Sequence, residues 1–173
     1  MWIAANDNKL RYTGRIDWSN EKEPVFVFPC TSVEMCFTGS TLRIHVRNRN
    51  VYWENYLGCI LDGVQSCYYL NNNGESVIEV LVPENEMNVH QVMFFKRQDA
   101  CHEMTVLGFE IGEQEKLCEL SCRSNRRIEV YGDSVSAGEV SEAVDYVGRE
   151  NPKHQGGYSN RHRSWQNILQ AGK

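Results

Sequence analysis

Apolar and polar side chains alternate along short segments in the first two thirds of the chain. Residues 33–37 read Val-Glu-Met-Cys-Phe, and residues 42–47 read Leu-Arg-Ile-His-Val-Arg. This period of two predicts β-strands with one buried and one solvated face. Other segments rich in β-branched and aromatic residues predict further strands at residues 56–61, 64–70, 76–82, 90–96 and 104–111.

Turn-forming residues separate these segments. Thr38-Gly39-Ser40 predicts a hairpin between the first two strands, and Asp62-Gly63 predicts a type I′ hairpin because that turn needs positive φ. Pro83 ends the strand at residues 76–82, since proline has no N–H for a β-ladder. About eight or nine short strands between residues 10 and 112, with no convincing helix among them, predict a mainly β fold, an antiparallel jelly-roll β-sandwich.

The pattern changes after residue 112. Residues 113–125 are polar and irregular, so we expect the sandwich domain to occupy residues 1–125 and to end in a linker. The rest of the chain carries three candidate elements: a strand at 127–131, a short helix at 140–147 and a helical pattern capped by Ser164. One strand and a helix start cannot bury their own apolar faces. Residues 126–173 are therefore expected to be the N-terminal fragment of an α/β domain, truncated early.

Composition and charge narrow the possible functions. A length of 173 residues allows one domain and part of another. A net charge of −5 argues against a nucleic-acid partner, which needs a basic surface. No apolar run approaches the ~20 residues that span a bilayer, and the N-terminus does not read as a secretory signal, so no membrane partner is predicted. Seven cysteines, an odd number, favour reduced thiols and a cytoplasmic location.

One motif carries recognisable chemistry. The predicted strand at 127–131 runs directly into Gly132-Asp133-Ser134. A serine placed immediately after a buried strand projects its Oγ from the carboxyl edge of a sheet, where active sites of α/β domains form. The small residues Gly132 and Gly138 would let a substrate carbonyl approach the backbone, and the N–H of Ser134 could donate to an oxyanion. A simple turn is the alternative interpretation, since Gly, Asp and Ser are all turn residues.

The chain resembles the two-domain bacterial esterases of carbohydrate esterase family 2. The residues that carry the resemblance are Gly14-Arg15-Ile16-Asp17, the block from Gly132 to Glu139, and Tyr158-Ser159-Asn160. The resemblance implies an N-terminal jelly roll joined to an SGNH (GDSL-type) hydrolase domain. It also implies removal of O-acetyl groups from plant polysaccharides such as acetyl xylan, or from oligosaccharides, without a metal or other cofactor.

By the same resemblance, Ser134 would be the nucleophile of acyl transfer, with Gly132, Asp133 and Gly138 supporting the motif. The family's general base is a His in an Asp-x-x-His block, and neither His154 nor His162 stands in such a block. The chain by itself is therefore expected to be inactive. The substrate of its parent enzyme is expected to be an acetylated saccharide or a small ester. The missing partner is expected to be the C-terminal part of the hydrolase domain. The alternative is a non-catalytic β-sandwich that binds carbohydrate or another protein.

Cysteines and histidines elsewhere give weaker signals. Cys118 and Cys122, with Cys101-His102 upstream, have a spacing too loose for a zinc motif, so no metal site is predicted. His45 and His90 alternate within predicted strands and are expected to be strand-face residues rather than ligands.

Three further groups of side chains have structural explanations. An aromatic-rich stretch could contact a sugar, although core packing is the favoured explanation for each ring; it comprises Tyr52, Trp53, Tyr56, Tyr68 and Tyr69. An acidic group after the motif is expected to be a solvated helix face, and consists of Glu139, Glu142 and Asp145. A basic group is expected to protect an exposed strand edge, and consists of Arg43, Arg47 and Arg49.

Overall fold

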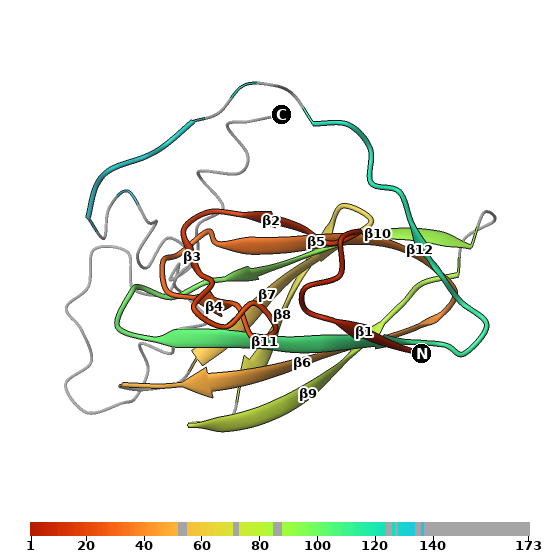
Figure 1. The fold of residues 1–173 in the computed structure, drawn as a ribbon, viewed down its shortest axis with the longest axis horizontal. Helices are drawn as coiled ribbons and strands as arrows, with labels where there is room; N and C mark the ends of the chain where they lie inside the picture. Colours follow the sequence, from red (N-terminus) through yellow and green to blue (C-terminus); the bar gives the residue numbers. More distant parts are fainter. Residues whose placement is uncertain are drawn as a thin grey trace, which may run out of the picture.

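The computed structural model describes residues 1–51, 55–70, 73–84, 88–123, 126, 128–133 and 136. This described part contains twelve β-strands and no helix. The strands form two six-stranded antiparallel sheets that lie face to face (Figure 1). The mainly β jelly-roll sandwich predicted from the sequence is therefore confirmed.

The first sheet has the order β3-β4-β11-β6-β9, and β1 also pairs with β11. Its strands are β1 (Trp2–Ala4), β3 (Ile16–Asp17), β4 (Val25–Phe26), β6 (Thr41–Arg49), β9 (Gly74–Leu81) and β11 (Glu103–Ile111). Its central pairings join strands that are distant in sequence: β6 pairs with β9 on one side and with β11 on the other.

The second sheet has the order β12-β5-β10-β7-β8, and β2 also pairs with β5. Its strands are β2 (Arg11–Thr13), β5 (Ser32–Thr38), β7 (Asn55–Leu61), β8 (Val64–Leu70), β10 (Val89–Lys96) and β12 (Leu117–Cys118). One edge of β5 pairs with β10 along its whole length. The other edge is shared end to end by two short strands, because β2 covers Ser32 to Glu34 and β12 covers Cys36 and Phe37.

The core lies between the two sheets and follows the period-two pattern of the sequence. In β6, Leu42, Ile44 and Val46 are fully buried, whereas the residues between them face outward. Phe94 of β10 and Phe109 of β11 stack across the interface with ring centroids 6.0 Å apart, which ties one sheet to the other. Each such buried side chain contributes about 1.5–3 kcal/mol from the removal of apolar surface from water.

Only one of the two predicted hairpins is present. Asp62 and Gly63 join β7 to β8 with φ values of 50° and 83°, so that hairpin prediction is confirmed. The hairpin predicted at Thr38-Gly39-Ser40 is wrong, because β5 and β6 lie in different sheets. Gly39, with φ of 99°, turns the chain from one layer to the other. The alternating pattern determines which face of each strand is buried, and it leaves open which strand becomes the neighbour.

The prediction that Arg43, Arg47 and Arg49 protect a strand edge is also wrong. They project from β6, which lies inside the first sheet between β11 and β9. On the outer face they form ion pairs with acidic side chains, mostly across the strands: Arg43 with Glu79 and Glu110, Arg47 with Glu23 and Glu75, and Arg49 with Glu103. Such exposed pairs are worth about 0.2–1 kcal/mol each, so they mainly keep the sheet surface solvated.

Two short strands, β1 and β12, lie outside residues 10–112, where the strands were predicted. β1 has three residues, which is too short for a periodic pattern, and it is held where the N-terminal amine donates to the carbonyl of Ile111 (2.6 Å). β12 falls within residues 113–125, which the polar composition had assigned to a linker. Its Leu117 is buried and adds to the core.

The predicted strand at 127–131 is not formed in the described residues 128–131. Ile128 and Val130 are 81% and 55% exposed. A strand needs a partner for its N–H and C=O groups, and the described part of the chain pairs no strand with this segment. The helices predicted at 140–147 and after Ser164 lie outside the described residues, as do Glu139, Glu142 and Asp145. The domain boundary at residues 125 and 126 stays a prediction.

Candidate functional site

The segment after β12 carries the predicted catalytic motif and is attached to the second sheet through β2. Arg11 donates to the carbonyl of Ser121 (2.7 Å). Arg123 donates to the hydroxyl of Thr13 and forms an ion pair with Glu34. Glu34, on β5, is only 3% exposed, because Arg11 and Arg123 cover its carboxylate from two sides. Burial lowers the pKa of each guanidinium, and the nearby positive charge of Arg11 lowers that of Arg123 further.

Arg15 holds the segment immediately before the motif. Its Nη2 donates to the hydroxyl of Tyr131 (3.3 Å), and its guanidinium lies 5.6 Å from the centre of that ring. The Tyr131 hydroxyl in turn donates to Glu129 (2.6 Å). Gly14 precedes Arg15 with φ of 103°, and a Cβ there would lie 3.1 Å from Thr31, so the tight turn requires glycine. The Gly-Arg pair of the N-terminal motif thus places a cation beside the last residue before Gly132.

The motif itself is only partly described. Gly132 and Asp133 are exposed. A Cβ on Gly132 would lie 2.0 Å from the Oγ of Ser136, so a larger residue there would require the Ser136 side chain to move. Ser134, the predicted nucleophile and oxyanion donor, and Gly138 lie outside the described residues. Their roles stay predictions.

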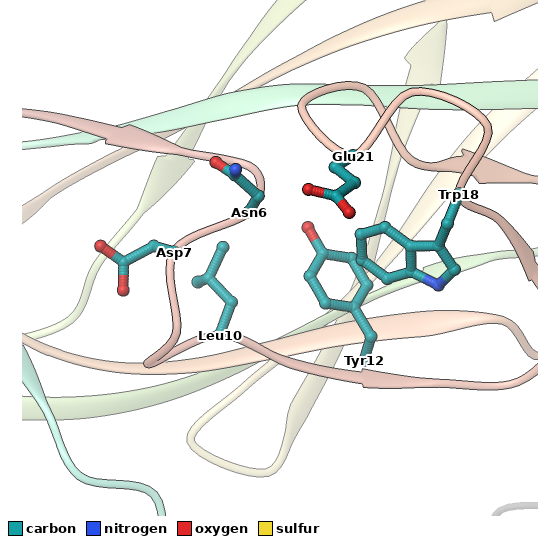
Figure 2. Close-up of a pocket in the computed structure, with 6 residues that line it drawn as sticks. All are labelled: Asn6, Asp7, Leu10, Tyr12, Trp18 and Glu21. Atoms are coloured by element: carbon teal, nitrogen blue, oxygen red, sulfur yellow. The ribbon is translucent and has the colours of Figure 1, made fainter.

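A hollow of about 370 Å³ lies beside β2. It is lined by Asn6, Asp7, Leu10, Tyr12, Trp18 and Glu21. Trp18 is 41% exposed, and the Tyr12 ring meets it edge to face at 4.9 Å. Figure 2 shows the Glu21 carboxylate and the Tyr12 hydroxyl on the same side of the hollow, with the indole of Trp18 beside the Tyr12 ring.

Local hydrogen bonds fix this hollow. Asp17 accepts from the backbone N–H (2.8 Å) and hydroxyl (2.6 Å) of Ser19, which closes a turn around Trp18. These two bonds lower the pKa of Asp17. Tyr12 donates to the carbonyl of Ala5 (2.6 Å), and burial raises its pKa, so the phenol stays protonated. An exposed indole with acidic and amide groups close by can hold a polar ring that has one apolar face, such as a sugar.

The hydrophobic and polar pattern of the sequence does not predict this hollow. A usable signal was present, because Asp17-Trp18-Ser19 places a large aromatic residue inside an Asx-type turn, where no core can bury it. Of the aromatic residues that were considered, Tyr56 and Tyr69 are opposed on β7 and β8 with their rings 5.6 Å apart, and Tyr68 packs against the core. Tyr52 and Trp53 lie outside the described residues.

The histidines differ in their surroundings. His45 lies on the outer face of β6, with Nε2 3.1 Å from Glu110, as expected for a strand-face residue. His90 is also a strand-face residue, on the buried face of β10, and its Nδ1 lies 2.6 Å from Asp62. Among the described residues, no group of three or more His, Cys, Asp or Glu side chains is arranged to hold a metal ion. No helix in the described part is long and apolar enough to cross a membrane.

Comparison with known proteins gives a consistent result. The family described as "Carbohydrate esterase 2 N-terminal" matches residues 12–120. The cellulase/esterase CelE of Acetivibrio thermocellus is 25% identical over 149 residues, which cover 86% of this chain and 18% of CelE.

Two solved structures share the fold. A family two carbohydrate esterase from Cellvibrio japonicus superposes with a TM-score of 0.78 at 20% identity, over 96% of this chain and 46% of that one. A family two carbohydrate esterase from Clostridium thermocellum, in complex with cellohexaose, gives 0.73 at 24% identity, over 90% and 44%. The chain thus spans less than half the length of these solved relatives and less than a fifth of CelE.

Proposed function

The chain belongs to the carbohydrate esterase 2 N-terminal family, and we therefore propose that it is the N-terminal part of a serine esterase that deacetylates O-acetylated carbohydrate. The family match over residues 12–120 is the observation that carries this proposal. The relationship to CelE and the shared fold of the two solved esterases support it.

In the proposed reaction Ser134 Oγ attacks the carbonyl carbon of an acetyl ester. The sugar hydroxyl leaves with a proton, and the acetyl group stays on the serine as an acyl-enzyme. The N–H of Ser134 donates to the oxyanion, and the small residues Gly132 and Gly138 leave room for the ester. Water then releases acetate. The general base and the other oxyanion donors are proposed to come from a C-terminal part of the hydrolase domain, since His154 and His162 do not stand in an Asp-x-x-His block.

The jelly roll would serve this reaction by positioning the segment that ends in the motif. Two contacts attach that segment to the sandwich. Arg123 of the segment pairs with Glu34 of β5, and Tyr131 of the segment accepts a hydrogen bond from Arg15. A nucleophile requires a fixed geometry relative to its base and oxyanion donors, because small displacements cost large factors in rate.

The experiment compares full-length parent enzyme with its Ser134→Ala variant on p-nitrophenyl acetate and acetylated xylo-oligosaccharides. We expect kcat to fall by roughly 10⁴–10⁶-fold. Ser121→Ala is the matched control, because only the carbonyl of Ser121 is used, and its rate should equal that of the parent. An unchanged rate in Ser134→Ala would falsify the nucleophile assignment.

A second candidate function is carbohydrate binding by the sandwich itself, and the hollow at Trp18 favours it. Titration calorimetry with cellohexaose and with acetylated xylo-oligosaccharides measures this directly on the chain. We expect Trp18→Ala to weaken binding by roughly tenfold or more, which is the loss of one stacking contact of about 1.4 kcal/mol. Phe28→Ala removes an equally exposed aromatic ring outside the hollow and serves as the control. Equal affinities for the two variants would exclude the hollow as the binding site.

A further inference from the structure

Two cysteines meet where β12 joins β5. Cys36 and Cys118 are direct partners in the antiparallel register. Directly opposed residues have Cα atoms about 4.5–5.5 Å apart, which falls within the range of about 4.4–6.8 Å that a disulfide bridges. Directly opposed residues point to the same side of a sheet, and Cys118 lies close enough to contribute, after burial, to the raised pKa of Cys36.

The pair lies at an accessible edge of the second sheet. Both cysteines are partly exposed, so a small reagent can reach them. β12 has only two residues and lies at the edge of its sheet, so it can shift by the small distance that bond formation requires. All seven cysteines lie in the described residues as free thiols, and in the described ladders only Cys36 and Cys118 face each other.

The other cysteines differ in accessibility or surroundings. Burial raises the pKa of the Cys30 and Cys59 thiols to about 12, so little thiolate is present at neutral pH. Cys67, Cys101 and Cys122 are exposed, and the cross-strand partner of Cys67 is Gly58. These three can take up a reagent singly.

We propose that Cys36 and Cys118 form an intramolecular disulfide by exchange with a low-molecular-weight disulfide such as oxidised glutathione. One cysteine thiolate attacks a glutathione sulfur, which gives a mixed disulfide and releases one glutathione thiolate. The other cysteine thiolate attacks the protein sulfur of that mixed disulfide and releases the second. The protein loses two thiol hydrogens and is oxidised, while the glutathione disulfide is reduced to two thiols. The inference does not depend on the proposed esterase function.

The bond would fix the start of the segment that leads to the catalytic motif. Cys118 ends β12, and the chain then continues to Ser121 and Arg123, which contact β2 and β5. The ring that it closes spans about 80 residues, so it restricts the unfolded chain strongly. The oxidised protein should therefore unfold at a temperature roughly 5–10 °C higher than the reduced one.

The test uses a chain with Cys67, Cys101 and Cys122 each replaced by serine, which leaves Cys36 and Cys118 as the reactive pair. The chain is incubated with oxidised glutathione, unfolded, alkylated and digested for mass spectrometry. We expect a peptide pair linked through Cys36 and Cys118, free of glutathione, with Cys30 and Cys59 alkylated. Thermal unfolding should show the higher midpoint, and dithiothreitol should reverse it.

The matched control adds Cys118→Ser to the same background. It should stop at a mixed disulfide with one glutathione and show no rise in the unfolding midpoint. If the serine background does not fold, the same linked peptide is sought in the unmodified chain. Stable glutathione adducts on Cys36 or Cys118 without the linked peptide, or linkage of either one to another cysteine, would overturn the proposal.

Discussion

At the scale of single residues, the ring of Phe95 packs over Gly58 on the second sheet. Phe95 is 1% exposed and lies directly opposite Gly58 in the pairing of β10 with β7. A Cβ on Gly58 would lie 2.1 Å from the Phe95 ring. The ring therefore occupies the space that a side chain at position 58 would need, and the sequence pattern of β7 gives no sign of it.

We expect Gly58→Ala to lower the free energy of unfolding by about 1–3 kcal/mol, because a fully buried ring must move. Gly74→Ala is the matched control, since a Cβ there meets nothing within 4 Å and no positive φ is required. Urea unfolding of the two variants measures the difference. Equal losses would show that the Phe95 ring adjusts freely.

A buried lysine makes stability depend on pH. Lys96 is 1% exposed, and its Nζ donates to the carbonyls of Gln98 (2.6 Å) and Asp99. Burial lowers the pKa of Lys96 from 10.5 to about 7, against the opposing pull of Asp99. Between these values the unfolded chain binds a proton that the folded chain does not, so this group makes the protein more stable as the pH rises.

The prediction compares the parent chain with Lys96→Met by urea unfolding from pH 7 to pH 9. The free energy of unfolding of the parent minus that of the variant should increase with pH, by at most about 1.4 kcal/mol per pH unit. Taking the difference cancels the cysteines, which titrate in both proteins. Parallel pH profiles would mean that Lys96 titrates alike in the folded and unfolded chains.

At the scale of elements, a buried carboxylate joins three parts of the second sheet. Glu34 on β5 pairs with Arg11 on β2 and with Arg123 in the segment after β12. The alternation in β5 predicts that Glu34 faces solvent. It faces outward from the sandwich, and the chain beyond β12 covers it, which is a contact between residues 89 positions apart.

We expect Glu34→Gln to lower the free energy of unfolding by about 2–3 kcal/mol, because Arg11 and Arg123 lose the buried carboxylate that both pair with. The loss is limited because both guanidiniums stay partly solvated. Glu79→Gln breaks the exposed pair with Arg43, which water screens, so it should cost clearly less. Urea unfolding compares the two. A similar small cost for both would show that water screens Glu34 as it screens Glu79.

At the scale of the whole molecule, the buried core of the described residues ends at Leu117. Residues 128–133 touch the sandwich through the exposed Arg15–Tyr131 contact. We therefore expect a chain that ends at Arg123 to unfold cooperatively. Its thermal midpoint should lie within about 4 °C of that of the 173-residue chain, which corresponds to a difference in unfolding free energy of less than about 1 kcal/mol. Calorimetry measures both. A much lower midpoint would place the domain boundary beyond residue 125.

The sequence by itself determined the seven longest strands, the alternating burial of β6, the Asp62-Gly63 hairpin and the family resemblance. These features are local, since side chains alternate along a strand and a type I′ turn needs particular residues at two positions. Only the tertiary structure decided that β5 and β6 separate into different sheets, that Arg43 lies inside a sheet, and that Trp18 borders a hollow. It also placed Cys36 against Cys118. Each of these depends on pairing between distant segments, and a period of two contains no information about which partner is chosen.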